Sequence, residues 1–298
     1  MTAHVAVVGA YGSAGVAAAQ ALVDDPEVRL TLIDDGDPGG GLCILRGCMP
    51  SKEVLSAAEH RYASRDDPRL DGLPTVDTSA VVARKDDHTA DFAGHRRAAV
   101  DRLADRDDVE LLRETARFVE DRRLAVGDRI VEPDYVVIAT GSTVNRPSLP
   151  GIDGVEPMTS ADVLDATTFP DSGVVMGFGY VGLELVPYLS EAGGMDLTVV
   201  EHDARPLDEA DPPFGDALLD YYREQFDVEI LTETTERRVE STAAGVRLTV
   251  ERAGEERAID ADRLLTFTGR RPALNGLGLS NTSLDPSPDW VRDTMQAP

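Results

Sequence analysis

The sequence predicts an α/β fold, because the pattern strand, glycine-rich turn, helix and strand occurs twice. The first copy occupies residues 4–35, and the second begins at residue 173. In each copy an apolar run rich in valine precedes the glycines, and a helical pattern of small and apolar residues follows them. The 298 residues are enough for two domains of about 100–200 residues each.

The first copy has the order of a dinucleotide-binding βαβ unit. Gly9 fits the tight turn of the glycine pattern, and Ala14 fits its third position. Tyr11 stands where the second glycine is usual, so we expect Gly12 and Gly15 to give the loop a shifted path. Taken alone, this copy fits a βαβ crossover without a nucleotide nearly as well.

The second copy carries an intact GxGxxG pattern at Gly177, Gly179 and Gly182, between a strand and a helix. Each copy then ends its second strand with a carboxylate, Asp34 or Glu201. These carboxylates are expected to accept hydrogen bonds from a ribose, and Glu201 would repel a 2′-phosphate. The second copy therefore favours NADH over NADPH.

The only two cysteines, Cys43 and Cys48, lie in the segment GGGLCILRGCMPSK at residues 39–52. Pro50 suits a first helical turn, which would put Cys48 at a helix N-terminus, where a thiolate is favoured. A buried core pair, a zinc site and a reversible disulfide are the possible roles. Zinc requires four ligands and no second cysteine pair exists, and the flanking glycines favour the disulfide.

This segment resembles the redox-active disulfide segment of the FAD-dependent pyridine nucleotide–disulfide oxidoreductases (class I). The family includes dihydrolipoamide dehydrogenase, the closest in type, glutathione reductase and mercuric reductase. The chain keeps the family's paired glycines, both cysteines, Gly47 and the PSK triplet, whereas Leu42 and Leu45 replace the usual threonine and asparagine. The segments ATG at residues 139–141 and TFTGRRP at residues 266–272 resemble two further family segments.

The resemblance implies two Rossmann-like dinucleotide-binding domains. The FAD domain would occupy residues 1–153, the NAD domain residues 154–270, and residues 271–298 would return to the FAD domain. The sequence ends before the family's second FAD motif and its C-terminal interface domain, so the FAD domain is expected to be incomplete. The full-length form is expected to be a homodimer.

The resemblance also implies site residues. Cys43 would exchange with substrate and Cys48 would face the flavin, with Lys52 and Glu184 forming an ion pair beside it; an exposed helix glutamate is the alternative for Glu184. No metal ligand is implied. The residues assigned to the cofactors FAD and NAD are Gly9, Gly12, Ala14, Asp34, Gly41, Lys52, Ala139, Thr140, Gly141, Gly177, Gly179, Gly182, Glu201 and Gly269.

The function implied is a dithiol/disulfide oxidoreductase that couples NAD(H), through FAD and the cysteine pair, to a small-molecule or lipoyl-type disulfide. Three alternatives stay open. They are a mercuric or other disulfide reductase on the same scaffold, a flavin NADH dehydrogenase without thiol chemistry, and a truncated nucleotide-binding fragment without catalytic activity.

The composition is strongly acidic, with 55 acidic residues against 29 basic ones and a net charge of −26. Only Lys52 and Lys85 are lysines. Such a surface disfavours nucleic acids and anionic membranes, and we interpret it as an adaptation to concentrated salt, with an arginine-biased genome as the alternative. No apolar run reaches the ~20 residues of a membrane span, and no leader precedes the first strand, so a cytoplasmic location is expected. We also expect His60, His88 and His95 to lie in solvent.

Overall fold

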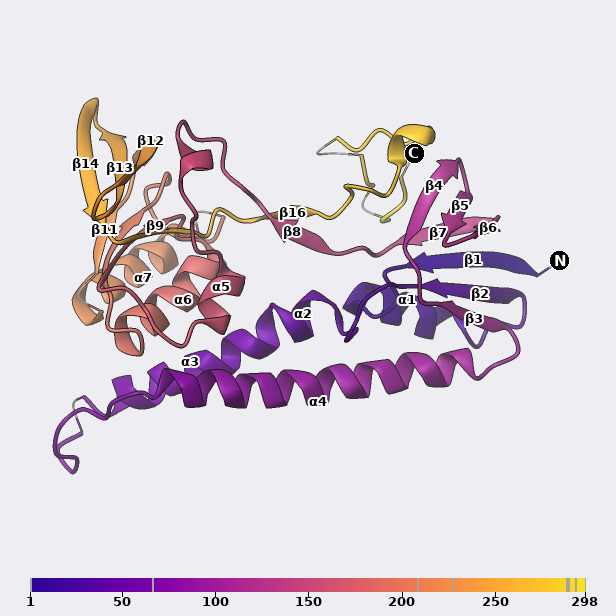
Figure 1. Cartoon of the computed structure of the whole chain (residues 1–298), viewed down its shortest axis with the longest axis horizontal. Helices are drawn as coiled ribbons and strands as arrows, with labels where there is room; N and C mark the ends of the chain where they lie inside the picture. The colour runs from indigo at the N-terminus through magenta and orange to yellow at the C-terminus, as the bar shows by residue number, and fades with distance from the viewer. Residues whose placement is uncertain are drawn as a thin grey trace. The chain divides into compact units, whose positions relative to one another are not determined.

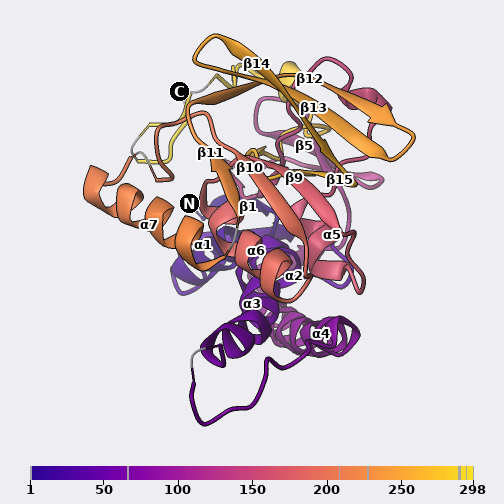
Figure 2. The same cartoon turned by 90° about the vertical axis from the view of Figure 1, so that its left-hand side faces the viewer.

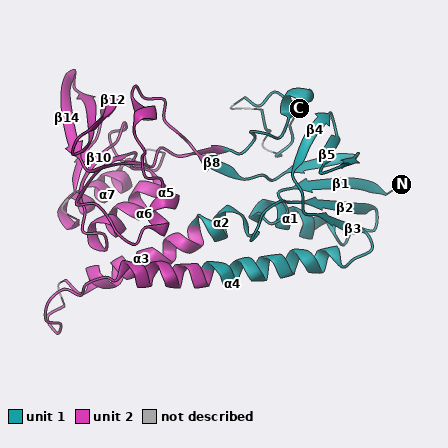
Figure 3. Ribbon diagram, viewed as in Figure 1, with its two compact units in different colours: residues 1–47, 89–143, 272–298 teal, residues 48–88, 144–271 magenta. Residues whose placement is uncertain are grey.

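The computed structural model describes residues 2–65, 67–207, 209–226, 228–287, 290–292 and 294–297. It divides into two compact units, shown in Figure 3, which are described separately. Unit 1 comprises Met1–Gly47, Thr89–Thr143 and Pro272–Pro298, and unit 2 comprises Cys48–His88 and Val144–Arg271. The predicted FAD and NAD domains divide the chain differently, and that division stays a prediction.

Unit 1 is built on a four-stranded sheet in the order β3-β2-β1-β7, in which every neighbouring pair is parallel. Its strands are β1 (Ala3–Val8), β2 (Val28–Ile33), β3 (Val109–Leu112) and β7 (Tyr135–Ile138). Helix α1 (Ser13–Leu22) connects β1 to β2. Because β1 lies inside the sheet and is covered on both faces, its residues 5–8 form one continuous apolar run.

Alternate residues of β1 enter two different cores. Val5 and Val7 pack with α1 and with Val100 of α4 (Thr78–Ala104), whereas Ala6 and Val8 pack with Phe118 of a small antiparallel sheet. That sheet has the order β4-β5-β6 and consists of Ala116–Glu120, Arg123–Val126 and Arg129–Val131. Figure 1 shows α1 and the antiparallel sheet on opposite faces of the parallel strands.

Unit 2 repeats this plan with the parallel order β11-β10-β9-β15. Its parallel strands are β9 (Ser172–Met176), β10 (Asp196–Val200), β11 (Glu229–Leu231) and β15 (Arg263–Thr266). Its helices include α5 (Ser160–Asp165), α6 (Tyr180–Glu191) and α7 (Pro212–Gln225). Its antiparallel sheet β12-β13-β14 consists of Thr234–Thr242, Gly245–Arg252 and Glu255–Ala261.

The same alternation separates two cores in unit 2. Val175 packs with α5, α6 and α7, whereas Val174 and Met176 pack against β12, β13 and β14. Figure 2 shows the helices below the parallel sheet and the antiparallel strands above it. In both units the three antiparallel strands are inserted between the third and fourth parallel strands. The predicted α/β class with two Rossmann-like sheets is confirmed.

The remaining elements lie in segments outside these sheets. α2 (Gly41–Leu45) belongs to unit 1, α3 (Cys48–Ala63) belongs to unit 2, and α4 has residues in both units (Figure 3). β8 (Ser142–Val144) pairs with β16 (Arg270–Pro272), and two short 3₁₀ helices are Ile152–Gly154 and Leu279–Asn281. Within the described ranges, none of the helices has both the length and the apolar character that a membrane span requires.

Candidate functional site

The first glycine turn follows β1, and glycine is required there by close backbone contacts. Gly9 has φ +95°, and a Cβ at this position would lie 2.2 Å from the carbonyl oxygen of Ala139. Gly12 is the N-cap residue of α1. A Cβ on Gly15 would lie 2.1 Å from the carbonyl oxygen of Gly9, whereas Ala14 is exposed. The assignment of Ala14 to the third glycine position is therefore wrong, because the helix starts later and brings Gly15 against the turn.

The second glycine turn follows β9 and is one residue shorter before its helix. Gly177 has φ +94°, and a Cβ there would lie 2.7 Å from the carbonyl oxygen of Phe267. Gly182 is pressed against Gly177, since its Cβ would lie 2.6 Å from the carbonyl oxygen of Gly177. Gly179 is the N-cap of α6, and a Cβ there would point into open space among the described residues. That space, at a helix N-terminus, can admit a phosphate group.

A carboxylate closes each glycine turn by the same pair of hydrogen bonds. Asp34 accepts from the backbone N–H groups of Tyr11 at 2.7 Å and Gly36 at 2.8 Å. Glu201 accepts from the backbone N–H groups of Phe178 at 2.6 Å and Asp203 at 3.1 Å. One bond goes to each oxygen, so each oxygen keeps a lone pair for a ligand hydroxyl. The two predicted ribose carboxylates thus occupy equivalent places in the two units.

Tyr11, which replaces the usual glycine of the first turn, is buried and fixed by its neighbours. Its carbonyl oxygen accepts a hydrogen bond from Arg96 Nη1 at 3.1 Å. A hydrogen bond to the Tyr11 side chain raises the pKa of Arg113. Gly39 is packed on the ring, since a Cβ there would lie 2.8 Å from a ring carbon. The tyrosine is accommodated because the cysteine segment begins with a glycine.

Both cysteines are disulfide-bonded, and since the chain has only two, Cys43 is bonded to Cys48. Cys43 lies in α2 and is half-buried, whereas Cys48 is exposed and is the first residue of α3. The predicted disulfide is confirmed, and so is the position of Cys48 at a helix N-terminus. A buried pair of free core thiols and a zinc-thiolate site are excluded for this oxidised form.

The cysteine segment touches the first glycine turn. Gly41 has φ +73°, and a Cβ there would lie 2.7 Å from the Cα of Gly12. The structure therefore brings together two of the glycines that the sequence assigned to one cofactor site.

Lys52 and Glu184 form an ion pair, as predicted. Lys52 follows Cys48 by four residues on α3, and Glu184 lies in the second turn of α6. Their side chains are 61% and 41% exposed, so the pair is solvated. Glu184 is thus a paired but still exposed helix glutamate, and its role beside a flavin stays a prediction.

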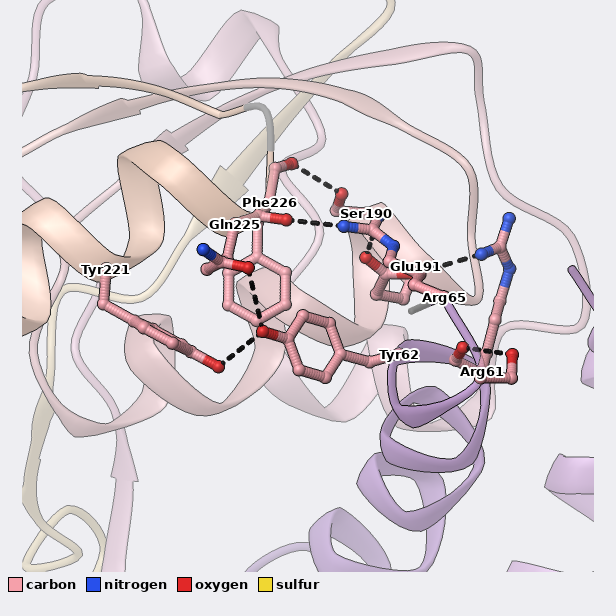
Figure 4. Close-up of polar contacts among 9 residues, drawn as sticks. Arg61, Tyr62, Arg65, Ser190, Glu191, Tyr221, Gln225 and Phe226 are labelled. Atoms are coloured by element: carbon pink, nitrogen blue, oxygen red, sulfur yellow. Dashed lines mark hydrogen bonds and ion pairs between the residues drawn. The ribbon is translucent and has the colours of Figure 1, made fainter. Parts of the chain in front are cut away.

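A second contact joins α3 to α6 nearer their C-terminal ends (Figure 4). The Glu191 side chain, 1% exposed, accepts from Arg61 Nη1 at 3.2 Å and forms an ion pair with Arg65. Because Lys52 precedes Arg61 and Glu184 precedes Glu191, the two helices run in the same direction. The disulfide end of α3 therefore lies at the same end as the glycine turn that begins α6.

Aromatic side chains extend this packing to α7 (Figure 4). The Tyr62 hydroxyl donates to Gln225 Oε1 at 3.0 Å and accepts from the Tyr221 hydroxyl at 2.8 Å. The Tyr62 and Phe226 rings lie 5.4 Å apart. Sequence reasoning missed this cluster and the Glu191 contact. The spacing of Arg61 and Arg65 by four residues was the available signal, because residues so spaced share a face of a continuous helix, although α3 ends at Ala63 and Arg65 follows it.

A glycine with positive φ follows the fourth parallel strand of each unit, three residues after the strand ends. Gly141 has φ +72° and Gly269 has φ +84°, and a Cβ at either would point into open space among the described residues. Ala139 and Thr140, which precede Gly141, are half-buried, and Ala139 lies against Gly9. Ala139 and Thr140 thus border the first glycine turn.

The three histidines expected in solvent, His60, His88 and His95, are exposed. His88 also pairs with Glu53 of α3, its Nδ1 lying 2.7 Å from Oε2. Within the described residues, no group of three or more histidine, cysteine, aspartate or glutamate side chains could hold a metal ion.

Several reductases and dehydrogenases are similar to this chain. Mercuric reductase of Bacillus cereus is 30% identical over 277 residues, which cover 92% of this chain and 42% of that relative. Dihydrolipoyl dehydrogenase of Haloferax volcanii is 30% identical over 296 residues, which cover 94% of this chain and 59% of that relative. The chain thus spans about half the length of these relatives.

Solved structures support the fold. The HOCl-induced flavoprotein disulfide reductase RclA from Escherichia coli superposes with a TM-score of 0.77 at 22% identity, covering 97% of this chain and 61% of that one. LpdA from Mycobacterium tuberculosis gives a TM-score of 0.76 at 23% identity, covering 96% and 62%. Residues 3–288 match the sequence profile described as "Pyridine nucleotide-disulphide oxidoreductase", and the chain belongs to that family.

Proposed function

We propose that this chain is the nucleotide-binding and disulfide-bearing part of an NAD(H)-coupled, FAD-dependent disulfide oxidoreductase of the dihydrolipoyl dehydrogenase type. One observation carries the proposal. The Cys43–Cys48 disulfide begins α3, and Lys52 of α3 pairs with Glu184 of α6, the helix that starts at the second glycine turn. A thiol redox centre and a nucleotide turn are thereby held at one end of a parallel helix pair.

The NAD(H) site is assigned to unit 2. The open space at Gly179 fits the pyrophosphate at the N-terminus of α6, where backbone N–H groups and the helix dipole favour anions. Glu201 is held in place to accept from the ribose hydroxyls. NADH is preferred to NADPH, because the same carboxylate repels a 2′-phosphate.

The FAD site is assigned to unit 1. Gly9, Gly12 and Asp34 reproduce the arrangement of the second turn, and the close contact of Gly41 with Gly12 joins this turn to the cysteine segment. Ala139, Thr140 and Gly141 border the turn. When bound, FAD supplies the two-electron transfer between the dinucleotide and the disulfide.

The disulfide residues have distinct roles in this proposal. A substrate dithiol reduces the pair by exchange. Its first thiolate bonds to one cysteine sulfur, and the partner cysteine leaves as a thiolate. Its second thiolate then attacks the substrate sulfur of this mixed disulfide, which forms the substrate disulfide and releases the other cysteine as a thiolate. Cys43 is assigned to the exchange with substrate. Cys48 is assigned to the flavin side, because the N-terminus of α3 stabilises a thiolate there. Lys52 and Glu184 are assigned to place one positive and one negative side-chain charge beside that thiolate.

Mercuric reduction is a second candidate, favoured by the 30% identity to mercuric reductase over 92% of this chain. A dithiolate formed from Cys43 and Cys48 would also be a ligand for a soft metal ion. A dithiol substrate and Hg(II) therefore have to be compared directly.

The cellular setting is inferred from composition and kinship. With two lysines and a net charge of −26, the protein suits a salt-rich cytoplasm, where salt screens its self-repulsion. We assign it a small-molecule or lipoyl-type disulfide substrate, and a homodimeric state to the full-length form.

The test uses the purified chain in molar salt. Anaerobic addition of NADH to the FAD-loaded protein should produce long-wavelength thiolate–flavin charge-transfer absorbance, and Cys48→Ser should abolish it. Two free thiols should appear per chain on thiol titration.

Turnover with lipoamide but not Hg(II) supports the first candidate, and the reverse supports the second. NADH–quinone turnover that Cys48→Ser leaves unchanged, without disulfide turnover, would contradict both. Failure to retain either cofactor would favour a fragment without catalytic activity.

A further inference from the structure

A histidine–glutamate pair stands next to the carboxylate assigned to the NAD ribose. His202 directly follows Glu201, and its Nε2 is paired with Oε2 of Glu236 on β12. The exposed fractions of the two side chains differ sharply, at 63% for His202 and 6% for Glu236. A buried carboxylate thus presents its partner imidazole at the surface beside the turn.

Two backbone hydrogen bonds connect the segment that carries His202 to the start of β12, the strand that carries Glu236. The N–H of Thr234 donates to the carbonyl oxygen of Glu201 at 3.0 Å, and the N–H of Glu233 donates to the carbonyl oxygen of Asp203 at 3.0 Å. The turn after β10 is therefore fixed to the start of β12.

The pairing of β12 with β13 shifts register between Glu236 and Arg238. Such a bulge redirects side chains, and bulges are common beside functional sites. Here the irregularity begins at Glu236, whose carboxylate is paired with His202.

The groups facing the imidazole are carboxylates: Glu236 from β12, and Glu201 and Asp203 from its own turn. The hydrogen bond to Glu236 and the negative charges of all three raise the pKa of His202 above its ordinary value, although partial burial acts in the opposite direction. The protonated ring therefore offsets negative charge beside the carboxylate that is assigned to the ribose of the anionic ligand.

We propose that His202 is a positioning residue for the dinucleotide: its imidazolium, held by Glu236, balances the carboxylates of the Glu201–Asp203 turn and makes NADH affinity fall with rising pH. The inference rests on the proposed NAD(H) site of unit 2. Deprotonation leaves three carboxylates uncompensated beside the cofactor and loosens the turn that carries Glu201. NADPH, with its additional phosphate, should be more sensitive still.

The first experiment measures the dissociation constant of NADH for the full chain in molar salt, from the change in NADH fluorescence. For the wild type we expect the constant to rise about three- to tenfold between about pH 6 and about pH 9, on either side of the ordinary histidine pKa of about 6.5. His202→Gln should show weak binding at both pH values. His60→Gln, which changes an exposed histidine on α3, should behave as the wild type.

The second experiment follows the imidazole signals by NMR without nucleotide. The His202 signal, assigned from the His202→Gln variant, should titrate above the ordinary value, and Glu236→Gln should move its midpoint toward about 6.5. A His202 midpoint at or below that value, or pH-dependent NADH binding that survives His202→Gln, overturns the inference. NADH binding that is strong but independent of pH overturns this inference alone, whereas absence of binding throughout overturns the NAD(H) site with it.

Discussion

The α carbon of Gly15 lies against the carbonyl oxygen of Gly9, so closely that a Cβ on residue 15 would be 2.1 Å from that oxygen. The partner atom belongs to the backbone and cannot rotate away. Gly182 has the same relationship to Gly177 in unit 2, at 2.6 Å. The helix thus approaches the glycine turn too closely for a Cβ in both units, although the first turn contains one more residue.

This contact predicts losses of stability of different size at neighbouring positions. Gly15→Ala should lower the free energy of unfolding of unit 1 by about 2 kcal/mol or more, because the backbone has to move. Ala14→Gly should cost only about 0.5–1 kcal/mol, the ordinary price of glycine in a helix. Urea denaturation of both variants measures the difference. Equal losses would mean that Gly15 does not hold the close position.

In the second turn, we expect Gly179 to be needed for nucleotide binding and Gly182 to be needed for stability of the fold. Gly179→Ala should leave the free energy of unfolding within about 0.5 kcal/mol of the wild type, since the new methyl group points into open space among the described residues. It should weaken NADH binding at least about tenfold, or about 1.4 kcal/mol, because the methyl group occupies the space assigned to the pyrophosphate.

Gly182→Ala provides the contrast, since its methyl group meets the backbone of Gly177 and should destabilise the fold itself. Urea denaturation and NADH fluorescence on the same samples distinguish the two effects. If Gly179→Ala binds NADH as tightly as the wild type, the pyrophosphate does not lie at that helix N-terminus.

The Glu191 contact predicts a large loss of stability at a position far from the proposed chemistry. Glu191→Gln leaves the Arg61 and Arg65 guanidinium groups without their buried partner. Removing one member of a buried ion pair costs about 3–5 kcal/mol, and the partial exposure of both arginines puts our expectation at the lower end. Glu59→Gln, an exposed change on α3, should stay within about 0.5 kcal/mol. Guanidinium chloride is unsuitable here because it screens ion pairs, so urea is the denaturant to use.

His4 predicts a pH dependence of stability in unit 1. Arg29 donates to its Nδ1 at 2.8 Å, and its Nε2 lies 2.8 Å from the Thr31 hydroxyl, so the folded state holds a neutral ring. Burial, and secondly the charge of Arg29, lower the pKa of His4 in the folded protein.

The unfolded chain therefore binds more protons as the pH falls below the ordinary histidine pKa of about 6.5, and stability decreases with it. The free energy of unfolding of the wild type should fall on acidification between about pH 7.5 and about pH 5.5, through the window opened by this lowered pKa. His4→Gln should remove that part of the slope, whatever its effect at neutral pH. An unchanged slope in the variant would show that His4 does not carry it.

Much of the fold and part of the candidate site could be predicted from local sequence patterns. Apolar runs followed by glycines and a helical period predicted both parallel-sheet units, because strand and helix periodicity are properties of neighbouring residues. The resemblance in the cysteine segment implied the Cys43–Cys48 disulfide and the Lys52–Glu184 ion pair. The structure contains both.

Other features depend on where distant segments meet. Whether Ala14 or Gly15 packs on the first turn is decided by the start of α1 relative to the sheet, which no local pattern records. The Glu191 contact joins helices more than a hundred residues apart, and Glu236 reaches His202 through a bulge in a different sheet. Such contacts depend on how closely the folded backbones approach each other. Close packing and burial then decide which side chains meet, because the sequence by itself does not distinguish among side chains of the same kind.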